Sequence, residues 1–178
     1  MILLETHRLY LRNVIPGDVD VMFDYRNHET CAQFQRGQAR DYEGIRQLIQ
    51  RHQDEGISAE KPFVLAIALK DTNEMIGEIV VMPSEKTFSL GYTVSYQYHR
   101  QGYAFEALTS LIALLHKTYP DWEFISFTDP ENHASMGLLT KLGYQNLGYV
   151  SSTRSQAYGK WVTQSTKEEF AQIVNYEK

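Results

Sequence analysis

The fold is decided by a short basic segment: His99-Arg100-Gln101-Gly102-Tyr103-Ala104. An extended run, S-L-G-Y-T-V-S-Y at 89–96, precedes it, and an amphipathic helix is predicted after it at 103–118. A strand-to-helix turn leaves backbone N–H groups without intrahelical partners, beside the positive end of the helix dipole. Gly102 lets a ligand approach the backbone, and Arg100 adds positive charge. The segment is a candidate phosphate-binding site, although a glycine in a basic turn often does no more than separate a strand from a helix.

A second polar segment follows a strand predicted at 122–128. It runs Asp129-Pro130-Glu131-Asn132-His133-Ala134-Ser135 and continues Met136-Gly137-Leu138-Leu139-Thr140-Lys141-Leu142-Gly143-Tyr144. Asn132 and Ser135 stand one helical turn apart, so their side chains share a face. Both residue types are also ordinary at the start of a helix. Spacing alone leaves helix capping and ligand contact open.

Together, the two segments resemble the GNAT acetyltransferase superfamily and, within it, the Rim-type ribosomal-protein N-acetyltransferases. The family pairs a pyrophosphate-binding turn, R/Q-x-x-G-x-G/A, with a later N-x-x-S-x-x-x-L-x-K-x-G-F/Y segment. The matching residues here are Gly102, Tyr103, Ala104, Asn132, Ser135, Leu139, Lys141, Gly143 and Tyr144. An opening L-E-T-H-R-L-Y-L-R at 4–12 and a late G-K-W-V at 159–162 also look like this subfamily. The similarity covers nearly the whole chain.

The resemblance implies a single GNAT domain over 1–178, with a mixed α/β fold. Its central sheet is expected to be mostly antiparallel and splayed, with about six to seven strands flanked by helices. Residue patterns agree with this class. Alternation or apolar runs predict extended segments at 8–14, 63–69, 75–82, 144–150 and 157–163. Apolar spacing predicts helices at 42–53, 103–118, 135–142 and 166–174, a helix following Asp18 as its N-cap, and a turn at 83–86.

The resemblance also implies acetyl-CoA as the donor. Backbone N–H groups of the turn would bind its pyrophosphate, which makes candidate donor-binding residues of His99, Arg100, Gln101, Gly102, Tyr103 and Ala104. The main chain of Tyr92, Thr93 and Val94 would pair with the pantetheine arm, although an ordinary central strand explains these residues equally well. Asn132 and Ser135 complete the candidate set. His99 departs from the Arg or Gln of the family, and Arg100 stands where many relatives have a small residue.

Two residues are candidates for catalysis, Ser135 and Glu78. The Ser135 hydroxyl is a candidate proton donor to the leaving thiolate, with Tyr144 as an alternative acid in principle. Many relatives carry Glu where this chain has Ser89, so Glu78 on the preceding strand is the candidate base. A protein α-amino group has a pKa of roughly 7.7–8.0, against about 10.4 for lysine, so an N-terminal acceptor needs little help to lose its proton. Asp129 and Glu131 are expected near the thioester end.

The expected function is therefore transfer of an acetyl group from acetyl-CoA to a primary amine, by direct attack in a ternary complex. Acceptors would be a protein N-terminus, an amino acid or a small amine, and the helices within 18–53 would flank the acceptor cleft. The alternative is a catalytically weak CoA-binding or sensing module, which Ser89 and the lack of a clear base suggest. The first predicts thiol release that depends on an amine, and the second predicts binding without turnover.

The composition of the chain argues against several other classes of function. The 178 residues carry 17 Lys+Arg and 22 Asp+Glu, a net charge of -5, which argues against a nucleic-acid surface. Cys31 is the single cysteine, so an intrachain disulfide and a thiolate zinc cluster are excluded, and the six histidines lack metal-ligand spacing, so no metal is expected. A signal-peptide pattern and an apolar run of the ~20 residues needed to cross a bilayer are lacking, so we expect no membrane and a cytoplasmic protein. A homodimer through the aromatic strand around Tyr158 and Trp161 is left open.

Overall fold

The computed structural model describes residues 1–175, and its centre is an eight-stranded sheet in the order β1-β2-β3-β4-β5-β6-β8-β7. Neighbouring strands pair antiparallel, with the exception of β5 and β6, which are parallel. The strands are β1 (Ile2–Glu5), β2 (Leu9–Asn13), β3 (Phe63–Leu69), β4 (Met75–Ser84), β5 (Thr87–Val94), β6 (Glu123–Thr128), β7 (Gln145–Val150) and β8 (Ser155–Lys160). The predicted mixed, mostly antiparallel fold is confirmed. The extra strand is β1, whose four residues are too short to show a pattern.

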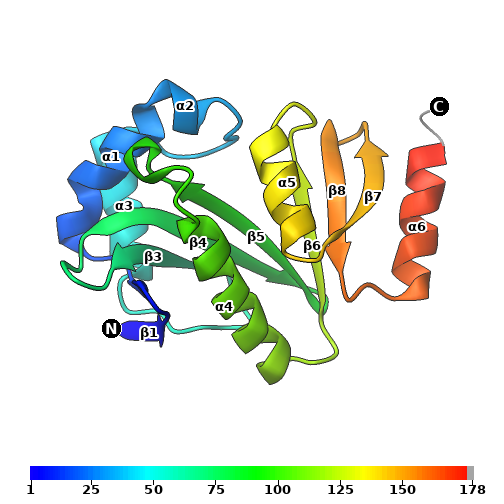
Figure 1. Cartoon of the computed structure of the whole chain (residues 1–178), viewed down its shortest axis with the longest axis horizontal. Helices are drawn as coiled ribbons and strands as arrows, with labels where there is room; N and C mark the ends of the chain where they lie inside the picture. Colours follow the sequence, from blue (N-terminus) through cyan, green and yellow to red (C-terminus); the bar gives the residue numbers. More distant parts are fainter. Residues whose placement is uncertain (176–178) are drawn as a thin grey trace.

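Helices cover both faces of this sheet (Figure 1). They are α1 (Val19–Asn27), α2 (Glu29–Ala32), α3 (Tyr42–His52), α4 (Tyr103–Thr118), α5 (His133–Lys141) and α6 (Gln164–Asn175), with short 3₁₀ turns η1 (Pro16–Asp18) and η2 (Tyr96–Tyr98). Strand β1 and helix α6 lie at opposite ends of the sheet (Figure 1). The final residues of the expected domain, 176–178, lie outside the described residues. Within residues 1–175, no helix is both long and apolar enough to cross a membrane.

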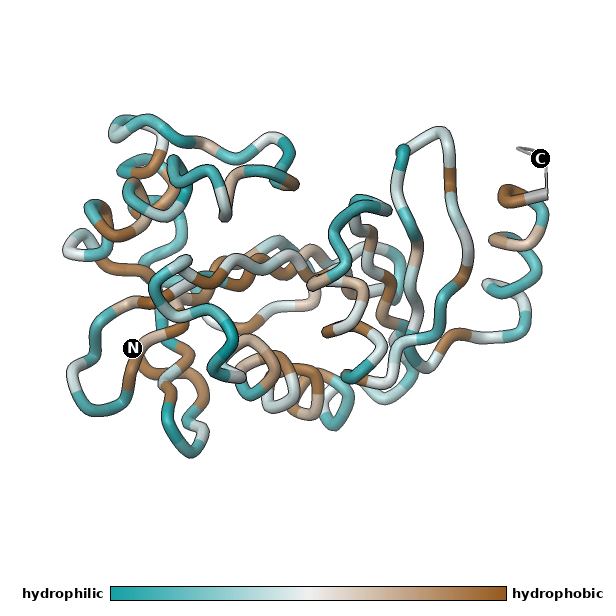
Figure 2. The backbone as a smooth tube through the Cα atoms, turned by 45° about the horizontal axis from the view of Figure 1, so that its top comes forward, coloured by the Kyte–Doolittle hydropathy of each residue, from teal (hydrophilic) through white to brown (hydrophobic). Residues whose placement is uncertain are grey.

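Strand β3 shows how the two layers form. Its seven residues are apolar throughout because alternate side chains enter two different cores. Phe63, Leu65 and Ile67 pack with α4 and α5, whereas Val64 and Ala66 pack with α1 and α3. In Figure 2 the hydrophobic colours follow the central strands and α4. The continuous apolar run therefore marks the middle of the sheet, as predicted.

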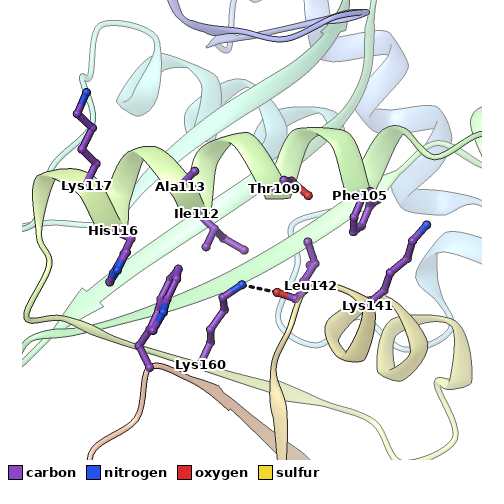
Figure 3. A pocket seen from close by; sticks show the side chains of 10 residues that line it. Phe105, Thr109, Ile112, Ala113, His116, Lys117, Lys141, Leu142 and Lys160 are labelled. Carbon is purple, nitrogen blue, oxygen red and sulfur yellow. Dashed lines mark hydrogen bonds between the residues drawn. The ribbon is translucent and has the colours of Figure 1, made fainter.

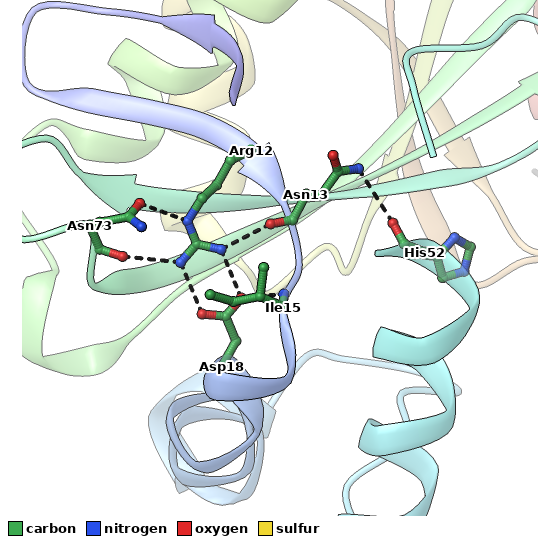
Figure 4. Close-up of polar contacts among 6 residues, drawn as sticks. All are labelled: Arg12, Asn13, Ile15, Asp18, His52 and Asn73. Atoms are coloured by element: carbon green, nitrogen blue, oxygen red, sulfur yellow. Dashed lines mark hydrogen bonds and ion pairs between the residues drawn. The ribbon is translucent and has the colours of Figure 1, made fainter. Parts of the chain in front are cut away.

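The N-terminal half is tied together by Asp18, in a way the sequence did not predict (Figure 4). Asp18 stands at the N-cap position of α1, but its side chain makes no capping bond. Both carboxylate oxygens instead accept hydrogen bonds from Arg12 at 2.9 Å, and one also accepts from the Ile15 N–H at 2.9 Å. Arg12 also donates to Asn73 in the β3–β4 turn, at 2.9 Å to its side chain. The predicted N-cap position of Asp18 is confirmed, but its carboxylate binds the buried guanidinium of Arg12 rather than the first N–H groups of α1.

The predicted turn at 83–86 is also shorter in the structure. Strand β4 continues through Ser84, and only Glu85 and Lys86 form the turn. Their φ angles are 47° and 63°, and two consecutive positive φ values match the twist of a tight hairpin. We predicted that the strand ends before Pro83, because proline is uncommon inside strands, but Pro83 lies within β4.

Candidate active site

The sheet opens between β5 and β6. Their parallel pairing is confined to Thr87 with Glu123 and Phe88 with Phe124. Beyond these pairs β5 remains bonded to β4 as far as Val94, while β6 remains bonded to β8 as far as Thr128. The two strands therefore diverge toward their C-terminal ends and leave a wedge lined by main chain.

The hydrogen-bond alternation of β5 shows which main-chain groups face this opening. Ser95 N–H donates to the Ile76 carbonyl at 2.7 Å, so Ser95 and, two residues back, Thr93 bond to β4. The intervening groups of Tyr92 and Val94 point away from β4, into the opening. Of the three main-chain contacts predicted for the donor, those of Tyr92 and Val94 face the opening, whereas the main chain of Thr93 is turned to β4.

Side chains contact the carbonyls on this edge. The Val94 carbonyl accepts from His99 Nε2 at 2.7 Å and lies 3.4 Å from the buried thiol of Cys31. The Tyr92 carbonyl lies 3.5 Å from Gln35 Nε2, which is a long and weak contact. His99 is exposed, but its ring is held against the end of β5. Cys31 is a free, buried cysteine.

The turn after β5 has the backbone shape that the sequence indicated. Gly102 is the N-cap of α4 with a φ of 80°, in the left-handed region that favours glycine. Arg100 has a φ of 60°, which is uncommon for a residue other than glycine, so two residues with positive φ bend the chain before the helix begins. Helix α4 starts at Tyr103 and runs to Thr118, as predicted. Its first N–H groups, near Ala104, are left at the positive end of a 16-residue helix.

An arginine from the start of the chain holds this turn in place. Arg8 donates from Nη1 to the Gln101 carbonyl at 3.0 Å and from Nε to Glu106 Oε2 at 2.7 Å. Its guanidinium also lies 4.2 Å from the ring centroid of Tyr103. Burial raises the pKa of Glu106, but hydrogen bonds from Arg8 and Thr6 outweigh it and leave that pKa below its ordinary value. We missed this role for Arg8, although the opening segment at 4–12 was the signal for it.

Asn132 and Ser135 meet the other side of the opening at the start of α5. Asn132 is the N-cap, and its Oδ1 accepts the Ser135 N–H at 3.1 Å, so Asn132 does cap the helix. The Ser135 hydroxyl is turned toward β5, where its Oγ lies 2.7 Å from the Tyr92 hydroxyl oxygen. Burial raises the pKa of Tyr92, partly offset by the bond to Ser135. Tyr144 is 5% exposed in the core, where burial holds its pKa well above the usual range.

Glu78 does not face solvent. It is 1% exposed, and Arg26 Nη2 of α1 lies 2.7 Å from both of its carboxylate oxygens. Gln38 Nε2 donates to the same carboxylate at 3.0 Å. Both oxygens of the Glu78 carboxylate are therefore engaged by side chains from α1 and the segment 33–41. The sequence analysis missed Arg26 as the partner of Glu78, because the two residues are 52 positions apart.

The segment 33–41, between α2 and α3, crosses to the far side of the opening. Arg36 donates to the carbonyls of Thr153 at 2.7 Å and Arg154 at 3.0 Å, in the β7–β8 hairpin. It also contacts Asp129 Oδ2 at 3.3 Å. Asp129 in turn accepts the Glu131 N–H at 2.9 Å. The Asp129 carboxylate therefore supports this loop, whereas the side chain of Glu131 is exposed.

A groove of about 400 Å³ runs along α4, on the side of α5 and β8 (Figure 3). It is lined by Phe105, Thr109, Ile112, Ala113, His116, Lys117, Lys141, Leu142, Lys160 and Trp161. Lys141 lies 4.2 Å from the ring centroid of Phe105, at the end nearest the Gly102 turn. Lys160 donates to the Leu142 carbonyl, and burial lowers its pKa. The described lining residues include three lysines and no acid, so the groove suits an anion with an aromatic body.

Comparison with known proteins agrees with this architecture. Residues 8–145 match the model of the acetyltransferase (GNAT) domain family. The uncharacterized N-acetyltransferase YnaD of Bacillus subtilis is 24% identical over 148 residues, covering 82% of this chain and 84% of that protein. Among solved structures, a GNAT-family acetyltransferase from Bacillus anthracis has a TM-score of 0.75 at 20% identity, covering 89% of this chain and 96% of that one.

The fold is also shared with RimL, the ribosomal L7/L12 alpha-N-protein acetyltransferase, with a TM-score of 0.75 at 17% identity over 91% of this chain and 94% of RimL. At such identities the solved structures establish a common fold. RimL is a Rim-type protein among those that share it, as the sequence resemblance led us to expect. The family model covers well over half of the sequence, including the turn at Gly102 and the start of α5. The chain therefore belongs to the GNAT acetyltransferase family.

Proposed function

We propose that this protein transfers the acetyl group of acetyl-CoA to a primary amine by direct attack in a ternary complex. The observation that carries the proposal is the wedge between β5 and β6, which leads directly into the left-handed turn at Gly102. An extended ligand arm fits such a wedge by pairing with the free edge of β5. A phosphate group fits the turn that follows, at the N-terminus of α4.

Each part of coenzyme A has a counterpart along this path. The amides of pantetheine would pair with the main chain of Tyr92 and Val94, and the pyrophosphate would lie over the N–H groups from Arg100 to Ala104. The adenosine 3′-phosphate would then lie toward Phe105 and Lys141, at the near end of the cationic groove. Solved relatives support such a ligand: one structure of RimL contains coenzyme A, and one of MccE contains acetyl-CoA and AMP.

In this arrangement the chemistry needs few side chains. The amine nitrogen attacks the thioester carbon, the C–S bond breaks, and the nitrogen gives up a proton. Main-chain N–H groups of β5 are the candidate donors to the oxyanion. The Ser135 hydroxyl is the candidate donor to the leaving sulfur. Glu78 lies behind the acceptor side, where Arg26 and Gln38 keep its carboxylate engaged.

The acceptor would approach from the side of α1–α3 and the segment 33–41. An amine with a low pKa suits this site, because no free carboxylate among residues 1–175 has been found in the opening to act as a strong base. A protein N-terminus, with a pKa of roughly 7.7–8.0, meets that condition better than a lysine at about 10.4. An amino acid or a small amine with a similar pKa remains within the proposal.

The first experiment is a calorimetric titration with acetyl-CoA of the wild type and the Gly102→Pro variant. Proline forces φ to about −65° and removes an N–H donor, so we expect micromolar binding by the wild type and loss of at least about tenfold in the variant. Gly56→Ala is the control, because a Cβ at that loop position meets no atom within 4 Å. Amine-dependent thiol release is then measured with a panel of N-terminal peptides, amino acids and small amines. Absence of wild-type binding would refute the proposal, and binding without turnover on any amine would favour the CoA-binding module.

A further inference from the structure

Two hydroxyl groups from different elements meet at the wedge, and the proposed chemistry uses only one of them. The Tyr92 hydroxyl from β5 lies 2.7 Å from Ser135 Oγ on α5. The backbone of Ser135 is fixed separately, since its N–H is bound by Asn132 at 3.1 Å. Tyr92 also contributes its main chain to the free edge of β5. The same residue thus contacts both the place of the pantetheine arm and the candidate donor to its sulfur.

The two hydroxyls differ in acidity, which sets the direction of their hydrogen bond. A phenol has a pKa of about 10, and it is a stronger donor than an aliphatic alcohol. We therefore expect Tyr92 to donate and Ser135 Oγ to accept. A serine hydroxyl has one proton and two acceptor positions, so its own proton then remains free for a third atom. Burial of Tyr92 keeps the phenol protonated in this arrangement.

We propose that Tyr92 is a positioning residue that directs the Ser135 hydroxyl at the sulfur of coenzyme A, so that the pair stabilises the leaving thiolate. The inference rests on the proposed function, because it needs the thioester beside Ser135. As the C–S bond breaks, its electron pair goes to sulfur, which accepts a hydrogen bond from Ser135. The N-terminal end of α5, a nine-residue helix, adds positive potential at this point.

The pair is expected to hold its protons during this step. A thiol of ordinary pKa, about 8.5, is more acidic than a phenol or an alcohol, so full transfer of a proton from the pair to the thiolate would be uphill. The thiolate is instead protonated by water, which receives the proton released by the attacking amine. Ser135 then acts as a hydrogen-bond donor in the transition state rather than as a general acid.

Binding of coenzyme A tests this without knowledge of the acceptor. We would measure the affinities of CoA and desulfo-CoA at pH 7 and pH 9.5, for the wild type and for Tyr92→Phe, Ser135→Ala and Tyr10→Phe. Stabilisation of the bound thiolate lowers the pKa of the bound thiol. The affinity for CoA relative to desulfo-CoA should therefore rise with pH, by about tenfold in the wild type, as for a hydrogen bond to a charged group.

The variants separate positioning from packing. Tyr92→Phe keeps the ring, and we expect the pH-dependent gain to shrink to about threefold, while Ser135→Ala abolishes it. Tyr10→Phe is the matched control, because it makes the same change on β2, three strands away from β5 in the sheet. It should retain the full gain. Binding of desulfo-CoA should be equal in all four proteins, which would show that each variant is folded.

Three results would overturn the inference. They are a full gain in Tyr92→Phe, a loss that appears in Tyr10→Phe instead, and a wild type with no gain although it binds both ligands. The last result leaves the proposed donor site intact. If the wild type binds neither ligand, the proposed function itself fails, and the positioning role fails with it.

Discussion

The two sides of the wedge are built by different means. On the donor side, β5, the Gly102 turn and α4 follow one another in the chain, and main-chain geometry creates the site. On the acceptor side, α1 and the segment 33–41 are held by side chains that reach across the molecule, such as Arg26 to Glu78 and Arg36 to Thr153. Local backbone shape leaves a motif in the sequence, whereas a distant side-chain contact does not. The acceptor side should therefore depend more on single side chains.

The largest expected effect is on the acceptor side, at Arg26. Arg26→Met leaves the carboxylate of Glu78 buried without its cation, and we expect the free energy of unfolding to fall by about 3–5 kcal/mol. Denaturant titration of the wild type and the variant measures this change. The double variant Arg26→Met with Glu78→Leu should recover much of the loss. A single variant as stable as the wild type would show that the pair is not essential to this side.

The donor side offers a smaller test at Arg8. Arg8→Met removes the bonds to Gln101 and Glu106 together with the contact to the Tyr103 ring, and we expect a loss of about 1–3 kcal/mol in unfolding free energy. Acetyl-CoA should also bind several-fold more weakly, because the turn is no longer held. Lys70→Met is the control: it removes the ion pair of Lys70 with Glu5, whose side chain is 59% exposed, and should cost less than about 1 kcal/mol. Equal effects of the two variants would contradict a specific role for Arg8.

A still smaller change in stability is expected at Arg36, whose side chain is 54% exposed. Arg36→Ala should cost less than about 1 kcal/mol and leave acetyl-CoA affinity unchanged, because its shortest hydrogen bonds go to the β7–β8 hairpin and its contact with Asp129, at 3.3 Å, is longer. Amine-dependent thiol release should nevertheless decrease, since the segment 33–41 is released from the far side of the wedge. Arg40→Ala is the matched control, since Arg40 contacts the carbonyls of Ala32 and Gln35 within its own region. A weaker affinity for acetyl-CoA in Arg36→Ala would contradict the division of the wedge into a donor side and an acceptor side.

These contrasts explain what could be predicted from the sequence. The bounds of α4 were predicted because apolar side chains recur at helical spacing after a glycine that must adopt a positive φ. The wedge was expected only through the family resemblance, because the pattern of apolar and polar residues in β5 and β6 does not show where these two strands diverge. The partner of Glu78 is 52 positions away, and that of Arg36 is 117 positions away, so no local pattern could have indicated them. Strand β1 was missed because four residues are too few for periodicity.

The smallest expected effect concerns pH and the donor side. Glu106 has a pKa below its ordinary value, because the hydrogen bonds from Arg8 and Thr6 outweigh burial. A carboxyl with a lowered pKa in the folded state adds stability above its unfolded pKa, and this contribution disappears as the pH falls through the folded value. The difference in unfolding free energy between the wild type and Glu106→Gln should therefore be constant near neutral pH and shrink below about pH 4.5. On the acceptor side, Glu43→Gln is a suitable comparison, because Glu43 is exposed and contacts only Gln47 among its described hydrogen-bond partners, at 3.0 Å. The unfolding free energy of Glu43→Gln should show the same pH dependence as that of the wild type. If Glu43→Gln instead changes with pH as Glu106→Gln does, the effect comes from net charge and not from the contact of Glu106 with Arg8.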